Sequence, residues 1–256
     1  MYPVLFHVGP IAVESFWVMV LFGFAASAMV TRGEFRRHGL DPGLAYDLIL
    51  YAYVGGLVGA RLFLVFTHWD RFVEDPFTFL LSGSGWVFYG GLIGGTLAVL
   101  WGVRRLRIPL AAVADAGGPA IAIGQAIGRL GCQLAGDGDY GIPSTLPWAM
   151  SYPNGVVPTM EAVHPTPIYE SLAYFAIFYF LWRNRGRFLP GEPLALYLIL
   201  ASAARFLVEF VRLNTVYAMG LTVAQWTSLV LIVLGGALDL WLRRAGDRRG
   251  AVAGSS

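Results

Sequence analysis

Residues 127–141, IGRLGCQLAGDGDYG, combine charged side chains with a run of glycines. Arg129 offers a planar fork of donors that stays protonated and matches phosphate or carboxylate oxygens in pairs. Asp137 and Asp139 follow closely and could pair with it or accept a proton. The glycines let the chain turn sharply and expose backbone N–H groups to an anion. The stretch therefore predicts an anion-facing elbow, with glycines at 128, 131, 136, 138 and 141.

Other charges stand where a membrane tolerates them poorly. Arg61 and Arg205, like Arg129, lie inside or at the ends of apolar stretches, and insertion scales assign a cost of about 2.5 to 3.5 kcal/mol to each such arginine at a helix centre. In RFLVEFVR, Arg205, Glu209 and Arg212 stand at i, i+4 and i+7, so one helical face carries plus, minus, plus.

Two interpretations of these arginines stay open. They pair with Glu209, Asp137 or Asp115 inside the membrane, or snorkel toward the interface. Alternatively, if Asp137 and Asp139 lie in water, the arginines outnumber the buried carboxylates. Such a surplus would suit an anionic ligand, and a phospholipid headgroup is the anion available at that depth.

Composition places the whole chain in a membrane. Of 256 residues 57% are hydrophobic and only 13% are charged, against about 25% in soluble domains. The net charge of +2 does not favour nucleic acid. A single cysteine excludes an intramolecular disulfide framework. The first apolar stretch begins at Ile11 without a basic region before it, so we expect a retained span rather than a cleavable signal peptide.

The elements that must hold these side chains are apolar spans of roughly 20 residues. They predict an all-α, polytopic membrane protein with about seven helices. We expect one transmembrane catalytic domain over 1–244, an external loop at 132–166 and a solvated cytoplasmic tail at 245–256. The predicted spans are 11–31, 44–67, 86–103, 111–131, 167–183, 193–211 and 221–242.

Arginine placement predicts the orientation. Clusters follow spans one, three, five and seven and account for 13 of the 18 arginines. Short arginine-rich loops stay in the cytoplasm. The N-terminus is therefore expected outside and the C-terminus inside, with external segments at 68–85, 132–166 and 212–220.

Paired glycines recur on the predicted spans. The stretches GGLVG at 55–59 and GGLIG at 90–94 are similar, and the glycine pairs at four-residue spacing are Gly55 and Gly59, Gly91 and Gly95, and Gly124 and Gly128. Such spacing is typical of close helix packing. The alternative is that a strip without side chains lets a headgroup or peptide lie against the backbone.

The ordered set of motifs resembles the bacterial prolipoprotein diacylglyceryl transferases. It comprises FYGGLIGG at 88–95, GQAIGRLGCQLAGDGDYG at 124–141, LPWAM at 146–150, HPTPIYE at 164–170 and RFLVEFVR at 205–212. The resemblance covers nearly the whole chain. It implies transfer of the diacylglyceryl group of phosphatidylglycerol to the lipobox cysteine in a prolipoprotein signal peptide, releasing glycerol phosphate. This would take place in the bacterial cytoplasmic (inner) membrane, toward the outer leaflet, with neither cofactor nor metal.

The resemblance also implies site residues. Arg129 and Arg205 match arginines the family treats as essential, and cations beside the departing phosphate are the expected catalytic device. The other candidate catalytic residues are Tyr89, Glu209 and His164. Candidate substrate-binding residues are Arg61, Gly90, Gly91, Gly94, Gly128, Cys132, Asp137 and Gly141.

Three positions depart from the family pattern. Tyr89 stands where many members have histidine, Cys132 where asparagine is usual, and Phe16 where tyrosine is common. The proton acceptor is thus left open among His164, Glu209 and an aspartate of GDGD. His164 could instead be a loop histidine that tethers the start of the fifth span, and Cys132 could be a small packing residue.

These departures keep two other functions open. One is a transferase that uses the same lipid donor with a different acceptor. The other is a phospholipid-binding or transport protein without chemistry, although no paired halves typical of transporters are visible.

Overall fold

The computed structural model describes residues 1–81 and 88–253. The chain divides into two compact units, one formed by Met1–Glu34 with Ala111–Ser256 and the other by Phe35–Leu110.

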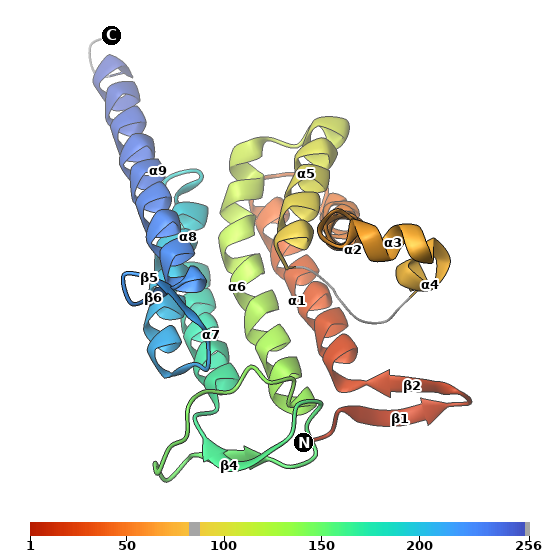
Figure 1. Ribbon diagram of the computed structural model, residues 1–256. Coiled ribbons are helices and arrows are strands. Elements are labelled where there is room, and N and C mark those ends of the chain that lie inside the picture. Colours follow the sequence, from red (N-terminus) through yellow and green to blue (C-terminus); the bar gives the residue numbers. More distant parts are fainter. Residues whose placement is uncertain (82–87, 254–256) are drawn as a thin grey trace. The chain divides into compact units, whose positions relative to one another are not determined.

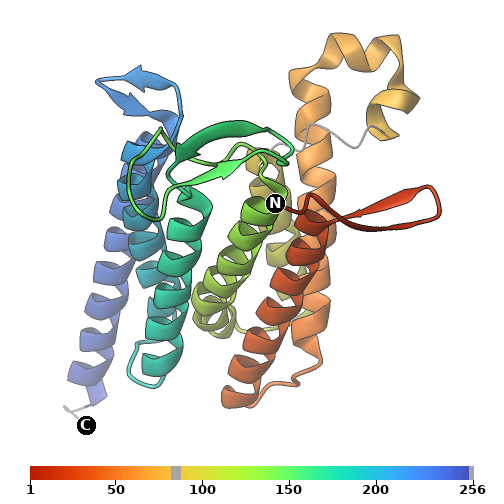
Figure 2. The ribbon, with the colours of Figure 1, turned by 90° about the horizontal axis from the view of Figure 1, so that it is seen from below.

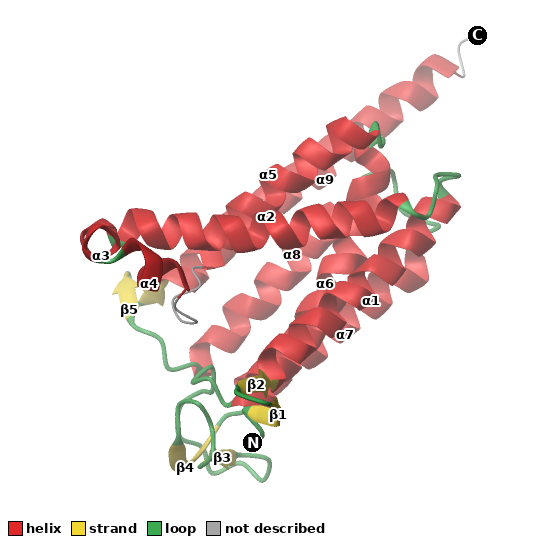
Figure 3. Ribbon diagram, turned by 90° about the vertical axis from the view of Figure 1, so that its right-hand side faces the viewer, coloured by secondary structure: helices red, strands yellow, loops and turns green. Residues whose placement is uncertain are grey.

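Helices build the larger unit (Figures 1 and 3). Proline stands in the first turn of α7 and α8, where its missing N–H costs no helical bond. Figures 1 and 2 both show α7, α8 and α9 side by side. The helices of this unit are α1 (Ser15–Arg37), α6 (Leu110–Ala135), α7 (Thr166–Asn184), α8 (Glu192–Val208), the 3₁₀ turn η1 (Glu209–Val211) and α9 (Val223–Ala253).

Small residues let the helices of this unit approach closely. Ala122 and Ala126 of α6 are fully buried in a core with Tyr174 and Leu181 of α7. Serine hydroxyls add polar links between helices, since Ser171 Oγ donates to the Ala126 carbonyl at 2.8 Å. Buried hydroxyl-to-carbonyl bonds of this kind are a common link in membrane proteins.

Within residues 1–81 and 88–253, three two-stranded antiparallel sheets accompany the helices. They are β1 (Val4–Val8) with β2 (Ile11–Glu14), β3 (Met150–Tyr152) with β4 (Thr159–Val163), and β5 (Val216–Ala218) with β6 (Leu221–Thr222).

The first hairpin corrects the start expected for the first span. Ile11–Glu14 pairs with β1 as a strand, and the helix begins only at Ser15. Hydropathy alone could not separate a short apolar strand from the helix that follows it. The second hairpin agrees with the expectation that 132–166 is no continuous helix, although α6 extends to Ala135 before the chain turns.

The smaller unit contains α2 (Leu44–Thr67), α3 (Trp69–Glu74), α4 (Pro76–Leu81) and α5 (Phe88–Leu106). Glycines bring α2 and α5 into backbone contact. A Cβ built on Gly59 would lie 2.3 Å from the Gly90 carbonyl oxygen, and one on Gly94 would lie 2.4 Å from the Gly55 carbonyl oxygen. Side chains at these positions would clash, so the packing interpretation is confirmed for Gly55 and Gly59. On α5 the closest approaches involve Gly90 and Gly94 rather than the predicted pair Gly91 and Gly95.

Five helices among the described residues are long and apolar enough to cross a membrane. They are Ser15–Arg37, Leu44–Thr67, Leu110–Ala135, Glu192–Val211 and Val223–Ala245. A mostly helical membrane protein is therefore confirmed. The count of seven spans and the orientation of the termini stay predictions. At the C-terminus, α9 continues to Ala253, beyond the end expected at 242, and residues 254–256 lie outside the described part.

Candidate functional site: an arginine and carboxylate cluster

The cluster forms where α6 ends, α7 begins and α8 runs into η1. After Ala135 the chain turns through Gly136 and Gly138, whose φ angles of 61° and 92° favour glycine. The Thr166 hydroxyl at the start of α7 donates to the Asp139 carbonyl. The elbow is therefore confirmed as a sharp turn, but it begins later than expected because Gly128 and Gly131 are helical.

Gly141 joins this loop to the end of η1. It forms an isolated β-bridge with Arg212, and the Ile142 N–H donates to the Val211 carbonyl at 2.9 Å. A Cβ on Gly141 would lie 2.0 Å from that same carbonyl oxygen. Only glycine permits this approach, which carries Asp139 toward Arg212.

Glu170 is the buried centre of the cluster. Its side chain is 1% exposed, and its two oxygens receive three guanidinium groups. Oε1 lies 2.6 Å from Arg205. Oε2 lies 3.2 Å from both Arg129 and Arg212. Charge-assisted bonds of this kind hold planar guanidinium groups in defined orientations.

Asp139 bridges two of the same arginines from the loop side. One carboxylate oxygen accepts from Arg129 and the other from Arg212. Burial alone would raise the pKa of Asp139, but the positive charges of Arg129 and Arg212 outweigh it and hold that pKa below its ordinary value.

Glu209 completes the cluster and ties it to the last hairpin. It lies 2.8 Å from Arg205, as the i, i+4 spacing predicted, and 3.8 Å from Arg212. Its Oε1 also accepts from the Asn214 amide at 2.6 Å and the Thr222 hydroxyl at 2.8 Å.

The expected surplus of guanidinium groups is absent from this part of the described structure. Arg129 and Arg212 each pair with Asp139 and Glu170, so Asp139 does not lie free in water, and Arg205 pairs with Glu170 and Glu209. The alternative of pairing is correct for Arg205 with Glu209. It is wrong about the partners of Arg129, which are Asp139 and Glu170 rather than Asp137. Asp115 instead accepts the Gly191 N–H at 2.7 Å.

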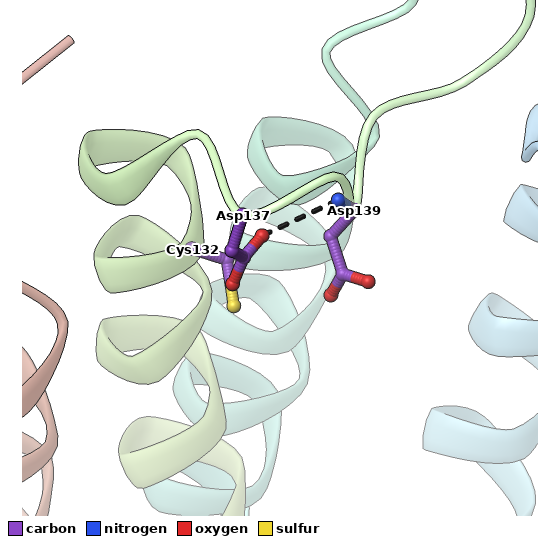
Figure 4. Close-up of side chains that lie close together, drawn as sticks. All are labelled: Cys132, Asp137 and Asp139. Atoms are coloured by element: carbon purple, nitrogen blue, oxygen red, sulfur yellow. Dashed lines mark hydrogen bonds between the residues drawn. The ribbon is translucent and has the colours of Figure 1, made fainter. Parts of the chain in front are cut away.

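Asp137 and Cys132 lie close to Asp139 of the cluster (Figure 4). Burial, and then the negative charge of Asp139, raise the pKa of Asp137. Cys132 is buried, with its sulfur 3.8 Å from Arg129 Nη1. Ligand atoms of Cys132, Asp137 and Asp139 lie within 4.8 Å of one another, a spacing that could hold a metal ion. A cation there would compete with the guanidinium groups already bound to Asp139.

His164 holds the loop between α6 and α7 in place. Its backbone N–H donates to Ile142, and its carbonyl accepts from Gly141 at 2.8 Å. Its Nδ1 lies 3.2 Å from the Tyr169 hydroxyl, which accepts from the Trp148 indole. These contacts account for His164 as a tether, and its catalytic role stays a prediction.

The remaining predicted site residues belong to the other unit. Arg61 lies on α2, and Tyr89, which is 43% exposed, lies on α5. Gly90 and Gly94 are explained by packing against α2. A role for these residues and for Gly91 toward a substrate stays a prediction.

Sequence reasoning missed Glu170. A signal was present, because a carboxylate near the start of an apolar span needs a cationic partner as much as an arginine does. The rule that singled out the arginines would have found it.

The fold and the cluster define a helical membrane protein with a concentrated ionic site at the ends of its helices. The sequence model of the prolipoprotein diacylglyceryl transferase family matches residues 3–241, so the chain belongs to this family.

Individual relatives carry the name of the same activity. The phosphatidylglycerol–prolipoprotein diacylglyceryl transferase of Leptospira interrogans is 34% identical over 228 residues, covering 78% of this chain and 72% of the relative. The enzyme of that name from Gloeobacter violaceus is 31% identical over 258 residues, covering 97% and 96%. That from Clostridium tetani is 28% identical over 238 residues, covering 92% and 95%.

Proposed function

We propose that this chain transfers the diacylglyceryl group of phosphatidylglycerol to the lipobox cysteine of a prolipoprotein and releases glycerol phosphate. Membership of the family supports the reaction. The observation that carries the choice of site is the convergence of Arg129, Arg205 and Arg212 around Glu170. A different acceptor, or lipid binding without chemistry, is not favoured by these findings.

The proposed reaction moves charge onto a group that the arginines of this cluster can stabilise. The acceptor sulfur forms a bond to the glyceryl carbon, the bond from that carbon to the phosphate oxygen breaks, and its electron pair leaves with glycerol phosphate. Negative charge therefore builds on the phosphate. Arg129 and Arg205, preorganised by Glu170, would stabilise it without rearranging during the step.

The thiol proton must also be accepted. Glu209 is a poor acceptor, because its oxygens already receive bonds from Arg205, Asn214 and Thr222. We assign it to holding Arg205. Asp137 is the better acceptor within this unit, since its raised pKa lets it take a proton more readily than Asp139 can.

The membrane arrangement is part of the proposal. We place seven spans in one catalytic domain in the bacterial inner membrane, with the N-terminus outside. The site uses the end of α6, the start of α7 and the end of α8, which alternating spans bring to one face. The arginine clusters would occupy the other face, as short cytoplasmic loops do.

Purified protein given phosphatidylglycerol and a lipobox peptide tests the function. Mass spectrometry should detect diacylglycerol on the peptide cysteine, and a serine peptide should remain unmodified. Arg129→Ala should abolish transfer, whereas Arg183→Ala, at the far end of α7, should retain it. Full activity in Arg129→Ala would overturn the proposed site.

A further inference from the structure

Asp139 is the accessible member of the three carboxylates in the cluster. Its side chain is 32% exposed, whereas those of Glu170 and Glu209 are 1% and 0% exposed. The two glutamates lie on helical elements, Glu170 on α7 and Glu209 on η1. Asp139 lies on the loop after α6. It follows Gly136 and Gly138, which both have positive φ, and precedes Tyr140.

The contacts of Asp139 are those expected of a bound oxyanion. Each of its two oxygens accepts from a different arginine, Arg129 on one side and Arg212 on the other. Two oxygens of a phosphodiester can make the same pair of charge-assisted bonds. The backbone carbonyl of Asp139 is held separately, by the hydrogen bond from the Thr166 hydroxyl. The Asp139 side chain can therefore rotate away without breaking this hydrogen bond.

The charge balance of the cluster also favours an anionic ligand at the position of the Asp139 carboxylate. Among the residues joined by these ion pairs, three guanidinium groups face three carboxylates while Asp139 is in place. When the Asp139 side chain leaves, three positive groups face two negative ones, and the difference is one positive charge. A phosphodiester carries one negative charge and would restore the balance.

We propose, on the basis of the transferase function above, that the Asp139 carboxylate occupies the phosphate position of the resting enzyme and is displaced when a glycerol phosphate group binds. Asp139 keeps Arg129 and Arg212 oriented while no phosphate is bound. It also lowers the affinity of any phosphate group, because that group must first displace it. The shared ligand chemistry is a glycerol phosphate oxyanion, from the lipid headgroup or from the released product.

Affinity of the full-length protein in neutral detergent tests this displacement. Isothermal titration at constant ionic strength compares glycerol phosphate and inorganic phosphate on wild type, Asp139→Asn and Asp139→Ser. Removing the competing charge should tighten glycerol phosphate binding about tenfold, because the two ion pairs of Asp139 with Arg129 and Arg212 no longer have to be broken. Glu161→Gln removes the same charge from exposed β4 and should leave the affinity unchanged.

A parallel assay separates the two sources of phosphate. If Asp139→Asn has a lower KM for phosphatidylglycerol in nanodiscs than wild type, and also binds glycerol phosphate more tightly, the position is assigned to the lipid headgroup. Tighter glycerol phosphate binding with an unchanged KM assigns it to the product. If wild type performs no transfer but Asp139→Asn still binds phosphate more tightly, the proposed function fails and the displacement stands.

Unchanged or weaker phosphate binding in folded Asp139→Asn and Asp139→Ser would overturn the proposal, because Asp139 would then be a brace for the arginines. Failure of both variants to fold, judged by thermal unfolding, would overturn it as well. A carboxylate that leaves on ligand binding cannot be indispensable to the fold.

Discussion

Arg205 donates to Glu170 across 2.6 Å, from the last turn of α8 to the first turns of α7, and the carboxylate that receives it is 1% exposed. This bond joins residues 35 positions apart. It belongs to a set in which Glu170 also receives Arg129 and Arg212. Glu170 therefore controls the orientation of every arginine that we assign to phosphate.

Glu170→Gln should destabilise the protein and abolish transfer. Breaking a buried ion pair from one side costs about 3 to 5 kcal/mol, because the partners left behind stay charged. Three arginines would then share two carboxylates. Thermal unfolding in detergent and the peptide transfer assay measure the two effects, with Glu161→Gln as the charge-matched control. Normal stability would show that Glu170 does not organise the cluster.

Asp137→Asn should stabilise the protein at neutral pH. Burial and the charge of Asp139 raise the pKa of Asp137 in the folded state. Ionisation above that raised value therefore costs folding free energy, whereas below the unfolded pKa of about 4 the group is protonated in both states and the penalty vanishes. The unfolding temperature of Asp137→Asn should exceed that of wild type at pH 7 and converge with it toward pH 4. A gain that grows on acidification would contradict this sign.

Gly141→Ala should disrupt the site, whereas Gly128→Ala should not destabilise the helix. A methyl group on Gly141 would lie 2.0 Å from the Val211 carbonyl oxygen and push Arg212 away, but the same group on Gly128 meets nothing within 4 Å. In α6 alanine is favoured over glycine by up to about 1 kcal/mol. Thermal unfolding compares the two variants. Loss of transfer in stable Gly128→Ala would support a substrate lying against that glycine, and retained transfer would remove that role.

Gly59→Ala should weaken the packing of α2 on α5 more than Gly56→Ala. The new methyl would lie 2.3 Å from the Gly90 carbonyl oxygen at position 59, but 3.6 Å from that of Gly91 at position 56, which is ordinary contact. A backbone carbonyl in a packed helix cannot move aside cheaply, so about 1 to 3 kcal/mol of stability should be lost at position 59 only. Equal unfolding temperatures for the two variants would show that the helices separate easily.

Local sequence patterns were sufficient to predict many structural features of this protein. Membrane helices are encoded by runs of apolar residues, so five of the predicted spans could be recognised before any fold was known. The pair Arg205 and Glu209 was equally accessible, because helical geometry places residues at i and i+4 together. The glycine spacing on α2 and α5 predicted their close approach for the same reason.

The partners of Arg129 could not be read in this way. Asp137 and Asp139 are both near it along the chain, yet Gly136 and Gly138 turn the loop so that Asp139 meets the guanidinium group. Glu170 arrives from another helix, 41 positions away, only because α6 and α7 pack together. Ion pairing depends on separations of a few ångströms, and such distances between remote segments are set by how the helices and loops pack rather than by their order in the chain.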